Sequence, residues 1–229
     1  ANLLPAVAGG IDYVPHVALA PNAARVEDAK LIAAIESSNI EYLRSVNNRP
    51  AGTWHWPGTP ARHILVHVPL PVNRVEQDYA NKVNFAIAQL NIKLDGILAL
   101  QAVTAIPTGS NYIQVSYGTA YVPADSTNYS AFCANVSTGP RSGNPIQPDG
   151  ENGIASSPVY LNLGNGRCDV SQDVVINEFG HALGLGTHFD GFGANGTPPV
   201  SAVFWDTLAT LYGNPRSTPS SALIVKRAK

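Results

Sequence analysis

The sequence contains no methionine, only two cysteines and few charged residues. Lys, Arg, Asp and Glu make up 13% of the 229 residues, and the formal net charge is −2. This charge balance does not favour binding to nucleic acid or to an anionic membrane surface. The sequence also lacks a run of about 18 apolar residues, so we predict no segment that inserts into a membrane. These absences remove nucleic-acid-binding and membrane-inserted proteins from the candidate classes.

What the sequence does have is enough apolar material for a sizeable core. With 45% hydrophobic residues over 229 positions, it can form one large domain or a domain with a small appendage. Residues 1–21 are rich in Pro, Ala and Gly, and helix formers dominate from Asn22 to about Val46. Breaker residues follow, up to Gly58. We therefore predict a partly helical N-terminal extension over residues 1–58 and a main domain over residues 59–229.

Hydrophobic periodicity predicts an alternation of strands and helices in the main domain. The expected strands are residues 64–68, 97–103, 112–117 and 159–163, and the expected helices are 79–90, 173–183 and 204–213. Residues 123–156 are rich in Ser, Asn, Gly and Pro and are predicted to form a long loop. The order strand, helix, strands, helix predicts an α/β (α+β) domain.

The two cysteines, Cys133 and Cys168, lie in Gly-, Ser- and Asn-rich surroundings. In a secreted protein they would pair, and closing a loop of this length would add about 3–4 kcal/mol in the chain-entropy model. Two buried free thiols are the alternative. We predict the disulfide, and with it an extracellular location.

The stretch 173–190 combines polar and apolar residues in a helical pattern. At 100° per residue, Val175 and Phe179 fall on one helix face, and Asn177 and His181 fall on the opposite face. We expect a helix that buries one side in the core and presents a polar site on the other. An ordinary amphipathic helix with a hydrogen-bonded His181 is the alternative.

The segment Asn177-Glu178-x-x-His181-x-x-Gly184 resembles the metzincin zinc-peptidase motif His-Glu-x-x-His-x-x-Gly-x-x-His, with Asn177 at the position of the first His. The resemblance covers roughly residues 62–215 and implies a metzincin-like zincin fold. In that fold a twisted mixed sheet is combined with a long helix, an active-site helix and a closing helix. The resemblance further implies a zinc ion gripped from consecutive helical turns, with Glu178 as the general base toward the attacking water. It also implies a sharp turn at Gly184 that returns a third ligand to the metal.

The sequence departs from the metzincin pattern in three respects. A neutral amide at Asn177 is a poor zinc ligand beside imidazole, so this is a natural pseudo-peptidase, a site with unusual ligands, or a substituted peptidase. The motif's last position falls on Thr187, so either His188, one residue later, or Asp190 is the candidate third ligand. The chain has no Met for the methionine turn of metzincins, and Val203 or a neighbour is expected to fill that apolar floor.

The resemblance implies a secreted zinc endopeptidase that acts on protein or peptide substrates, weakened or inactivated by Asn177. The alternative is a catalytically dead zincin that serves as a binding or inhibitory module. A third hypothesis is a carbohydrate- or surface-binding protein with an accidental motif. We expect a monomer.

Three weaker features are predicted to be structural. His63 and His67 share a strand face about 13 Å apart, too far to hold one metal. Residues 54–56, Trp-His-Trp, are expected to pack in the core rather than to plug a site. Residues 149–153 contain oxygen ligands for calcium, although a plain turn is the simpler interpretation.

Overall fold

The computed structural model describes residues 25–47, 52–57, 62–109, 111–154 and 158–229. The predicted boundary near residue 58 and the irregular segment 1–21 lie outside these ranges. The elements follow in the order α1 (Asp28–Ile35), the π-helix η1 (Glu36–Ile40), α2 (Glu41–Asn47), β1 (Ile64–His67), α3 (Arg74–Lys93), β2 (Leu100–Val103), β3 (Ile113–Tyr117), the 3-10 turn η2 (Tyr129–Ala131), β4 (Ala134–Ser137), β5 (Val159–Leu163), α4 (Gln172–Ala182), α5 (Ala202–Tyr212) and the 3-10 turn η3 (Ser220–Ala222).

The strands form one five-stranded sheet in the order β2-β1-β3-β5-β4. All neighbouring strands are parallel except β4, which runs antiparallel to β5 at the edge. The central strands bury Val66, Val115 and Leu161 completely, because both faces of a parallel sheet are normally covered. The predicted mixed α/β architecture is confirmed.

The prediction of a loop over residues 123–156 is wrong for its middle, which contains η2 and β4. β4 has only four residues, and Asn135 and Ser137 are poor strand formers. Pairing with β5 rather than local propensity therefore makes this segment a strand. The correction matters because β4 borders the candidate site.

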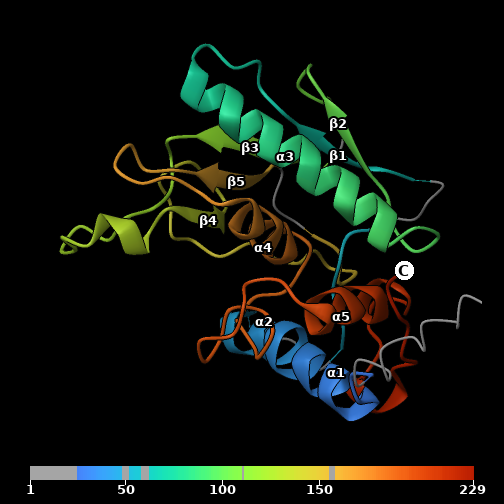
Figure 1. Ribbon diagram of the computed structural model, residues 1–229. Coiled ribbons are helices and arrows are strands. Elements are labelled where there is room, and N and C mark those ends of the chain that lie inside the picture. The colour runs from blue at the N-terminus through green and yellow to red at the C-terminus, as the bar shows by residue number, and fades with distance from the viewer. Residues whose placement is uncertain (1–24, 48–51, 58–61, 110, 155–157) are drawn as a thin grey trace, which may run out of the picture.

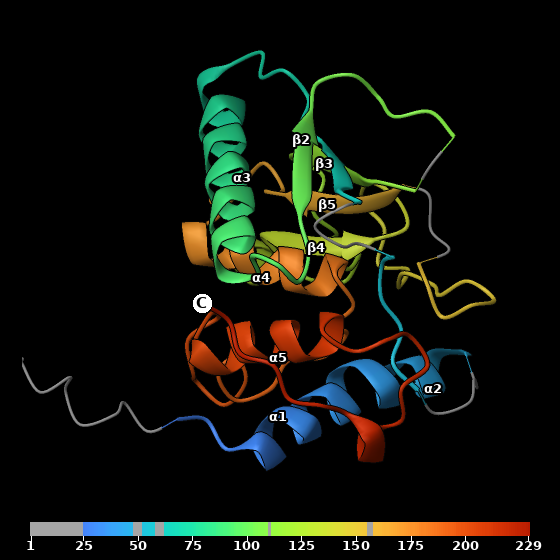
Figure 2. The same cartoon turned by 90° about the vertical axis from the view of Figure 1, so that its right-hand side faces the viewer.

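In the views of Figures 1 and 2 the sheet, α3 and α4 form the upper part of the molecule, and the other labelled helices form the lower part. α3 contacts β2 and α4, and α4 also contacts β4 and β5. Below α4 lie α5 and the N-terminal helices α1 and α2. α4 therefore runs between the sheet and the lower helices, with the candidate site beside it.

The described part of the N-terminal segment shares a core with the end of the chain. α1 contacts α5 and η3. Leu31, Ile35 and Trp54 are fully buried, and Trp56 is 2% exposed, so the Trp-His-Trp stretch packs in the core as predicted. If the N-terminal segment detached, these large apolar side chains would be exposed to water, which is unfavourable. The described part of this segment is therefore an integral part of the fold.

We expect Trp54→Ala to lower the free energy of unfolding by about 3–5 kcal/mol, since it removes a fully buried indole and leaves a cavity. The change also removes the bond from the Trp54 Nε1–H to the carbonyl of Asn39, at 2.8 Å. Phe85→Ala is a suitable control, because the Phe85 side chain is 48% exposed. Urea denaturation of both variants measures the difference. Equal effects would contradict an integral N-terminal segment.

The predicted disulfide is confirmed. Cys133 and Cys168 are bonded across 35 residues, with their Cα atoms 5.7 Å apart. The bond joins the residue that precedes β4 to the segment that leads into α4. It therefore ties the edge strand to the start of the helix that carries the candidate motif.

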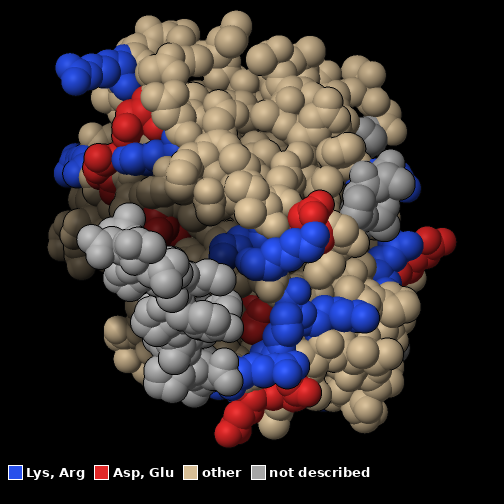
Figure 3. Space-filling model, turned by 45° about the vertical axis from the view of Figure 1, so that its right-hand side comes forward, with Lys and Arg blue, Asp and Glu red and all other residues tan. Residues whose placement is uncertain are grey.

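The surface agrees with the low charge of the sequence. On the face shown in Figure 3, charged side chains lie in small groups of both signs, and uncharged residues cover most of the rest. Within the described ranges, no helix has the length and apolar character that crossing a membrane requires.

Candidate active site

Helix α4 carries Asn177, Glu178 and His181, the helical part of the motif. The side chain of Ser171 caps its first turn by accepting a bond from the N–H of Val174. Val175 and Phe179 are fully buried, so the apolar face of α4 packs into the core. Glu178 and His181 of the motif border a cleft of about 250 Å³, whereas Asn177 does not line it.

Two histidines meet at this cleft. Nε2 of His181 lies 3.1 Å from Nε2 of His188. Nδ1 of His181 lies 2.5 Å from the carbonyl oxygen of Leu185, which can only accept, so we assign the ring proton to Nδ1. The Nε2 lone pair of His181 therefore faces His188. This is the arrangement in which a backbone carbonyl orients a metal-binding imidazole.

The environment keeps both rings neutral. Burial, together with the neighbouring His188, lowers the pKa of His181 to about 4. Burial also lowers the pKa of His188. A neutral imidazole has the free lone pair that a metal ligand requires. Phe192 packs against both rings, at centroid distances of 4.8 Å and 5.2 Å. Phe204, the neighbour of Val203, stacks on Phe192 at 5.2 Å.

Glu178 is the most unusual group in the cleft. Its side chain is 7% exposed, and Oε2 has no hydrogen-bond partner among the described residues. Burial raises the pKa of this carboxyl to about 8. An unpaired buried carboxyl is costly to the fold, and such groups concentrate at functional sites.

The raised pKa of Glu178 predicts a pH-dependent stability. Its folded-state pKa of about 8 exceeds the ordinary value of 4.5, so the folded state binds the proton more tightly. Stability is therefore highest below about pH 4.5 for this group and is lost as the pH rises to about 8. In metal-free protein, we expect Glu178→Gln to gain free energy of unfolding relative to the parent chain over this range, by a few kcal/mol at about pH 8. Thermal unfolding in EDTA at pH 5 and pH 8 measures it.

The control for this measurement is Glu151→Gln, because the side chain of Glu151 is 85% exposed. This exposed substitution should change stability little at either pH. A constant difference between Glu178→Gln and the parent chain at both pH values would show that the Glu178 carboxyl is not held in its neutral form.

Asn177 is buried beside Gly193, close to His188. It is 4% exposed, and its Nδ2 donates to the carbonyl of Pro199 at 2.9 Å. A Cβ atom at Gly193 would lie 3.7 Å from Nδ2 of Asn177 and 3.7 Å from Nε2 of His188. Asn177 and His188 therefore both border Gly193, and Asn177 precedes His181 by one helical turn.

Of the two candidate third ligands, only His188 lines the cleft. Asp190 is exposed, and its Oδ1 accepts a bond from Nδ2 of Asn195 at 2.6 Å. The turn after α4 is one residue longer than in the motif it resembles. It thus brings His188, rather than Thr187 or Asp190, opposite His181.

The donor set fits zinc only in part. Two tetrahedral ligands at 2.0–2.1 Å from zinc lie about 3.3 Å apart, close to the 3.1 Å between the two Nε2 atoms. In the described part of the chain, however, no group of three His, Cys, Asp or Glu side chains is arranged to hold a metal ion. The arrangement supplies two strong ligands, with the weak amide of Asn177 beside them.

The sequence did not predict two parts of the cleft lining. The edge strand contributes Ala134, Asn135 and Val136, and the N-terminal helix contributes Tyr42. Burial raises the pKa of the Tyr42 hydroxyl, which keeps its proton at neutral pH. No local motif marks these residues, because their position depends on the pairing of β4 with β5 and on the docking of α2.

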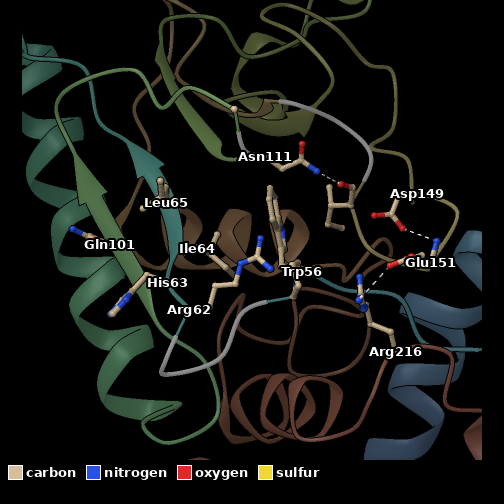
Figure 4. Close-up of a pocket in the computed structure, with 13 residues that line it drawn as sticks. Trp56, Arg62, His63, Ile64, Leu65, Gln101, Asn111, Asp149, Glu151 and Arg216 are labelled. Atoms are coloured by element: carbon tan, nitrogen blue, oxygen red, sulfur yellow. Dashed lines mark hydrogen bonds and ion pairs between the residues drawn. The ribbon is translucent and has the colours of Figure 1, made fainter.

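A larger cavity, of about 620 Å³, lies near β1 and β2 (Figure 4). Arg62 points into it beside Trp56, and Arg216 pairs with Glu151 at 3.9 Å. Its charged groups are of both signs, and it lacks the paired imidazoles of the α4 cleft. We therefore place the candidate chemistry at α4.

The weaker sequence features lie apart from the α4 cleft. His67 is buried and contacts Gln114 Oε1 at 2.8 Å and the carbonyl of Thr104 at 3.2 Å, whereas His63 lines the larger cavity. Oδ1 of Asp149 accepts bonds from the backbone N–H groups of Glu151 and Gly153, both at 2.8 Å. This bonding is typical of a tight turn.

Comparison with known proteins adds no assignment: no family model matches the chain, and no curated protein is significantly similar to it.

Proposed function

We propose that this chain has the active-site arrangement of a metzincin-type zinc endopeptidase in which Asn177 replaces one metal ligand. In this form it would bind zinc weakly and hydrolyse peptide bonds slowly or not at all. The observation that carries the proposal is the buried carboxyl of Glu178, unpaired at Oε2, in the same cleft as the facing imidazoles of His181 and His188. A zincin needs this combination of a general base and two imidazole ligands.

His181 and His188 would hold the zinc ion through their Nε2 atoms, with the amide of Asn177 as a weak third ligand. Bound zinc would supply Lewis acidity, polarising the scissile carbonyl and lowering the pKa of the attacking water. The bond from His181 Nδ1 to the Leu185 carbonyl keeps that ring in the required tautomer and orientation.

Glu178 would move the proton. A general base must be ionised, and a cation in the cleft would lower the pKa of Glu178 from about 8. The carboxylate would take a proton from the attacking water and then deliver it to the leaving amine. The burial that raises the pKa of this carboxyl also keeps bulk water from competing for that proton.

An extended peptide would lie along β4. This strand is at the edge of the sheet and pairs with β5 on one side only. Ala134 and Val136 of β4 line the cleft together with Glu178 and His181. Pairing with an exposed strand edge is a general way to bind peptides without dependence on sequence.

A binding or inhibitory module is the second candidate, and one observation favours it. The amide of Asn177 is buried and bonded to the carbonyl of Pro199. It is therefore integrated into the fold rather than left free beside the two imidazoles. An extracellular location belongs to either proposal, and the disulfide supports it.

Zinc content and casein hydrolysis, measured on the chain with added zinc and with EDTA, test the proposal. We expect zinc well below one ion per chain and at most a slow hydrolysis that EDTA abolishes. Hydrolysis that persists in EDTA would contradict a zinc-dependent site. Tight peptide binding without turnover, both here and after Asn177→His, would favour the binding module.

A further inference from the structure

The turn that follows α4 and carries His188 is held by side chains from other parts of the chain. Nε1 of Trp56 donates to the carbonyl of Ala182 at 2.7 Å. The hydroxyl of Tyr212 donates to the carbonyl of Leu183, also at 2.7 Å. The turn therefore depends on tertiary partners for its conformation.

Ser38 of the N-terminal helix makes the contacts nearest to His188. Its Oγ donates to the carbonyl of Thr187 at 2.5 Å and accepts from the N–H of Thr187 at 3.3 Å. The backbone carbonyl of Ser38 accepts from the N–H of Gly186 at 2.6 Å. Ser38 is fully buried, so no water replaces these bonds if they are lost.

Asn39 holds the beginning of the same turn. Its Nδ2 donates to the carbonyls of Gly184 and Trp54, at 2.7 Å and 2.8 Å, and its Oδ1 accepts from the N–H of Trp54 at 3.2 Å. This fully buried amide thus links the site turn to the Trp-His-Trp segment. Both N–H donors and the carbonyl acceptor of the side chain are used.

The backbone on both sides is adapted to this contact. Ser38 and Asn39 lie in the π-helix η1, and π-turns inside helices are rare and often occur at functional sites. Opposite them, Gly184 has φ +111°, and a Cβ there would lie 3.2 Å from Nδ2 of Asn39. A Cβ at Gly186 would lie 2.2 Å from the ring of Tyr42, so only glycine permits this approach.

We infer that Ser38 and Asn39 are positioning residues of the active site, which hold the turn so that Nε2 of His188 faces Nε2 of His181. The value of that geometry for metal binding rests on the proposed function, but the contact between the two rings exists without metal. The N-terminal helix is thereby part of the site. Hydrogen bonds from η1 fix the conformation of the longer turn, so that His188 rather than Thr187 faces His181.

Nuclear Overhauser contacts between the two imidazole rings in the metal-free full chain test the inference. Ser38→Ala should abolish or strongly weaken the His181–His188 contact, while the contact between His181 and Phe192 remains. Ser37→Ala is the matched control, because the exposed Ser37 hydroxyl bonds only to the carbonyl of Ala34 in its own helix, at 3.3 Å. The substitution leaves the backbone carbonyl of Ser37, which accepts from the hydroxyl of Thr187 at 3.3 Å, in place. Ser38→Thr, which keeps the hydroxyl, should restore the ring contact.

A second measurement separates positioning from general stability. In the Asn177→His background, at a temperature where all variants are folded, Ser38→Ala should weaken zinc binding about 10–100-fold, as loss of an outer-shell partner does. Ser37→Ala should not change it. If Ser38→Ala does not fold, Ser38→Cys takes its place, since the thiol is similar in size and a weaker hydrogen-bond donor.

The outcomes are distinguishable. Loss of the ring contact in Ser38→Ala, in a background that binds no zinc, would support the positioning role and contradict the proposed function. An intact ring contact and an unchanged zinc affinity in Ser38→Ala would overturn the positioning role and leave the proposed function standing.

Discussion

Replacing Asn177 by histidine is expected to raise zinc affinity by on the order of a hundredfold or more, since each imidazole contributes a large share of the binding free energy of a zinc site. Position 177 lies one helical turn before His181, and Asn177 and His188 both border Gly193. A third imidazole there would complete a three-histidine site. We expect the Nδ1–H of the new ring to take over the bond to the Pro199 carbonyl that Asn177 now makes. Competition with a chromogenic chelator measures the affinity.

The control for this change is Asn177→Ala, which removes the same amide without adding a ligand. It should bind zinc no better than the parent chain. Equal zinc affinity in the alanine and histidine variants would show that the gain comes from removing the amide, not from a third ligand. Hydrolysis of casein should rise together with affinity in the histidine variant alone.

Glu178→Ala in the Asn177→His background is expected to keep zinc and lower kcat by about a hundredfold to ten-thousandfold, the usual contribution of a general base. Glu178 lines the cleft, but its carboxyl is not needed as a ligand when three imidazoles are present. Metal content, measured by atomic emission, should therefore stay unchanged. The kcat, measured with a fluorogenic peptide, should fall. The substitution also removes an unpaired buried carboxyl, so the variant should be no less stable at pH 8.

Glu151→Ala serves as the matched control, because Glu151 is exposed and borders the other cavity. It should leave both zinc content and kcat unchanged. Loss of zinc together with activity in Glu178→Ala would instead identify Glu178 as a ligand. Full activity in that variant would exclude it as the base.

The sequence predicted most of the elements because their signals are local. α3 and α4 have strong helical periodicity, and α4 also has a capping residue, Ser171, at its start. The disulfide could also be predicted from the sequence, since the chain has only two cysteines and therefore one possible intramolecular pairing. The residues of the motif share one helix, so their relative positions follow from helix geometry alone.

The remaining parts depend on contacts that are distant in sequence. β4 is a strand because β5 pairs with it, and η1 widens where Ser38 and Asn39 meet a turn about 145 residues later. The choice of His188 over Asp190 also depends on that turn, whose conformation is set from outside. Composition and periodicity contain no signal for such pairings, because the partners are brought together only in the folded chain.

Anomalous diffraction at the zinc absorption edge, on crystals of the Asn177→His variant grown with zinc, would locate the metal itself. The account predicts one strong peak about 2.0–2.2 Å from the Nε2 atoms of His181, of His188 and of the imidazole introduced at position 177. The carboxyl of Glu178 should lie beside the open coordination position. A peak bound by Asp190 in place of His188, or no peak beside α4, would contradict it.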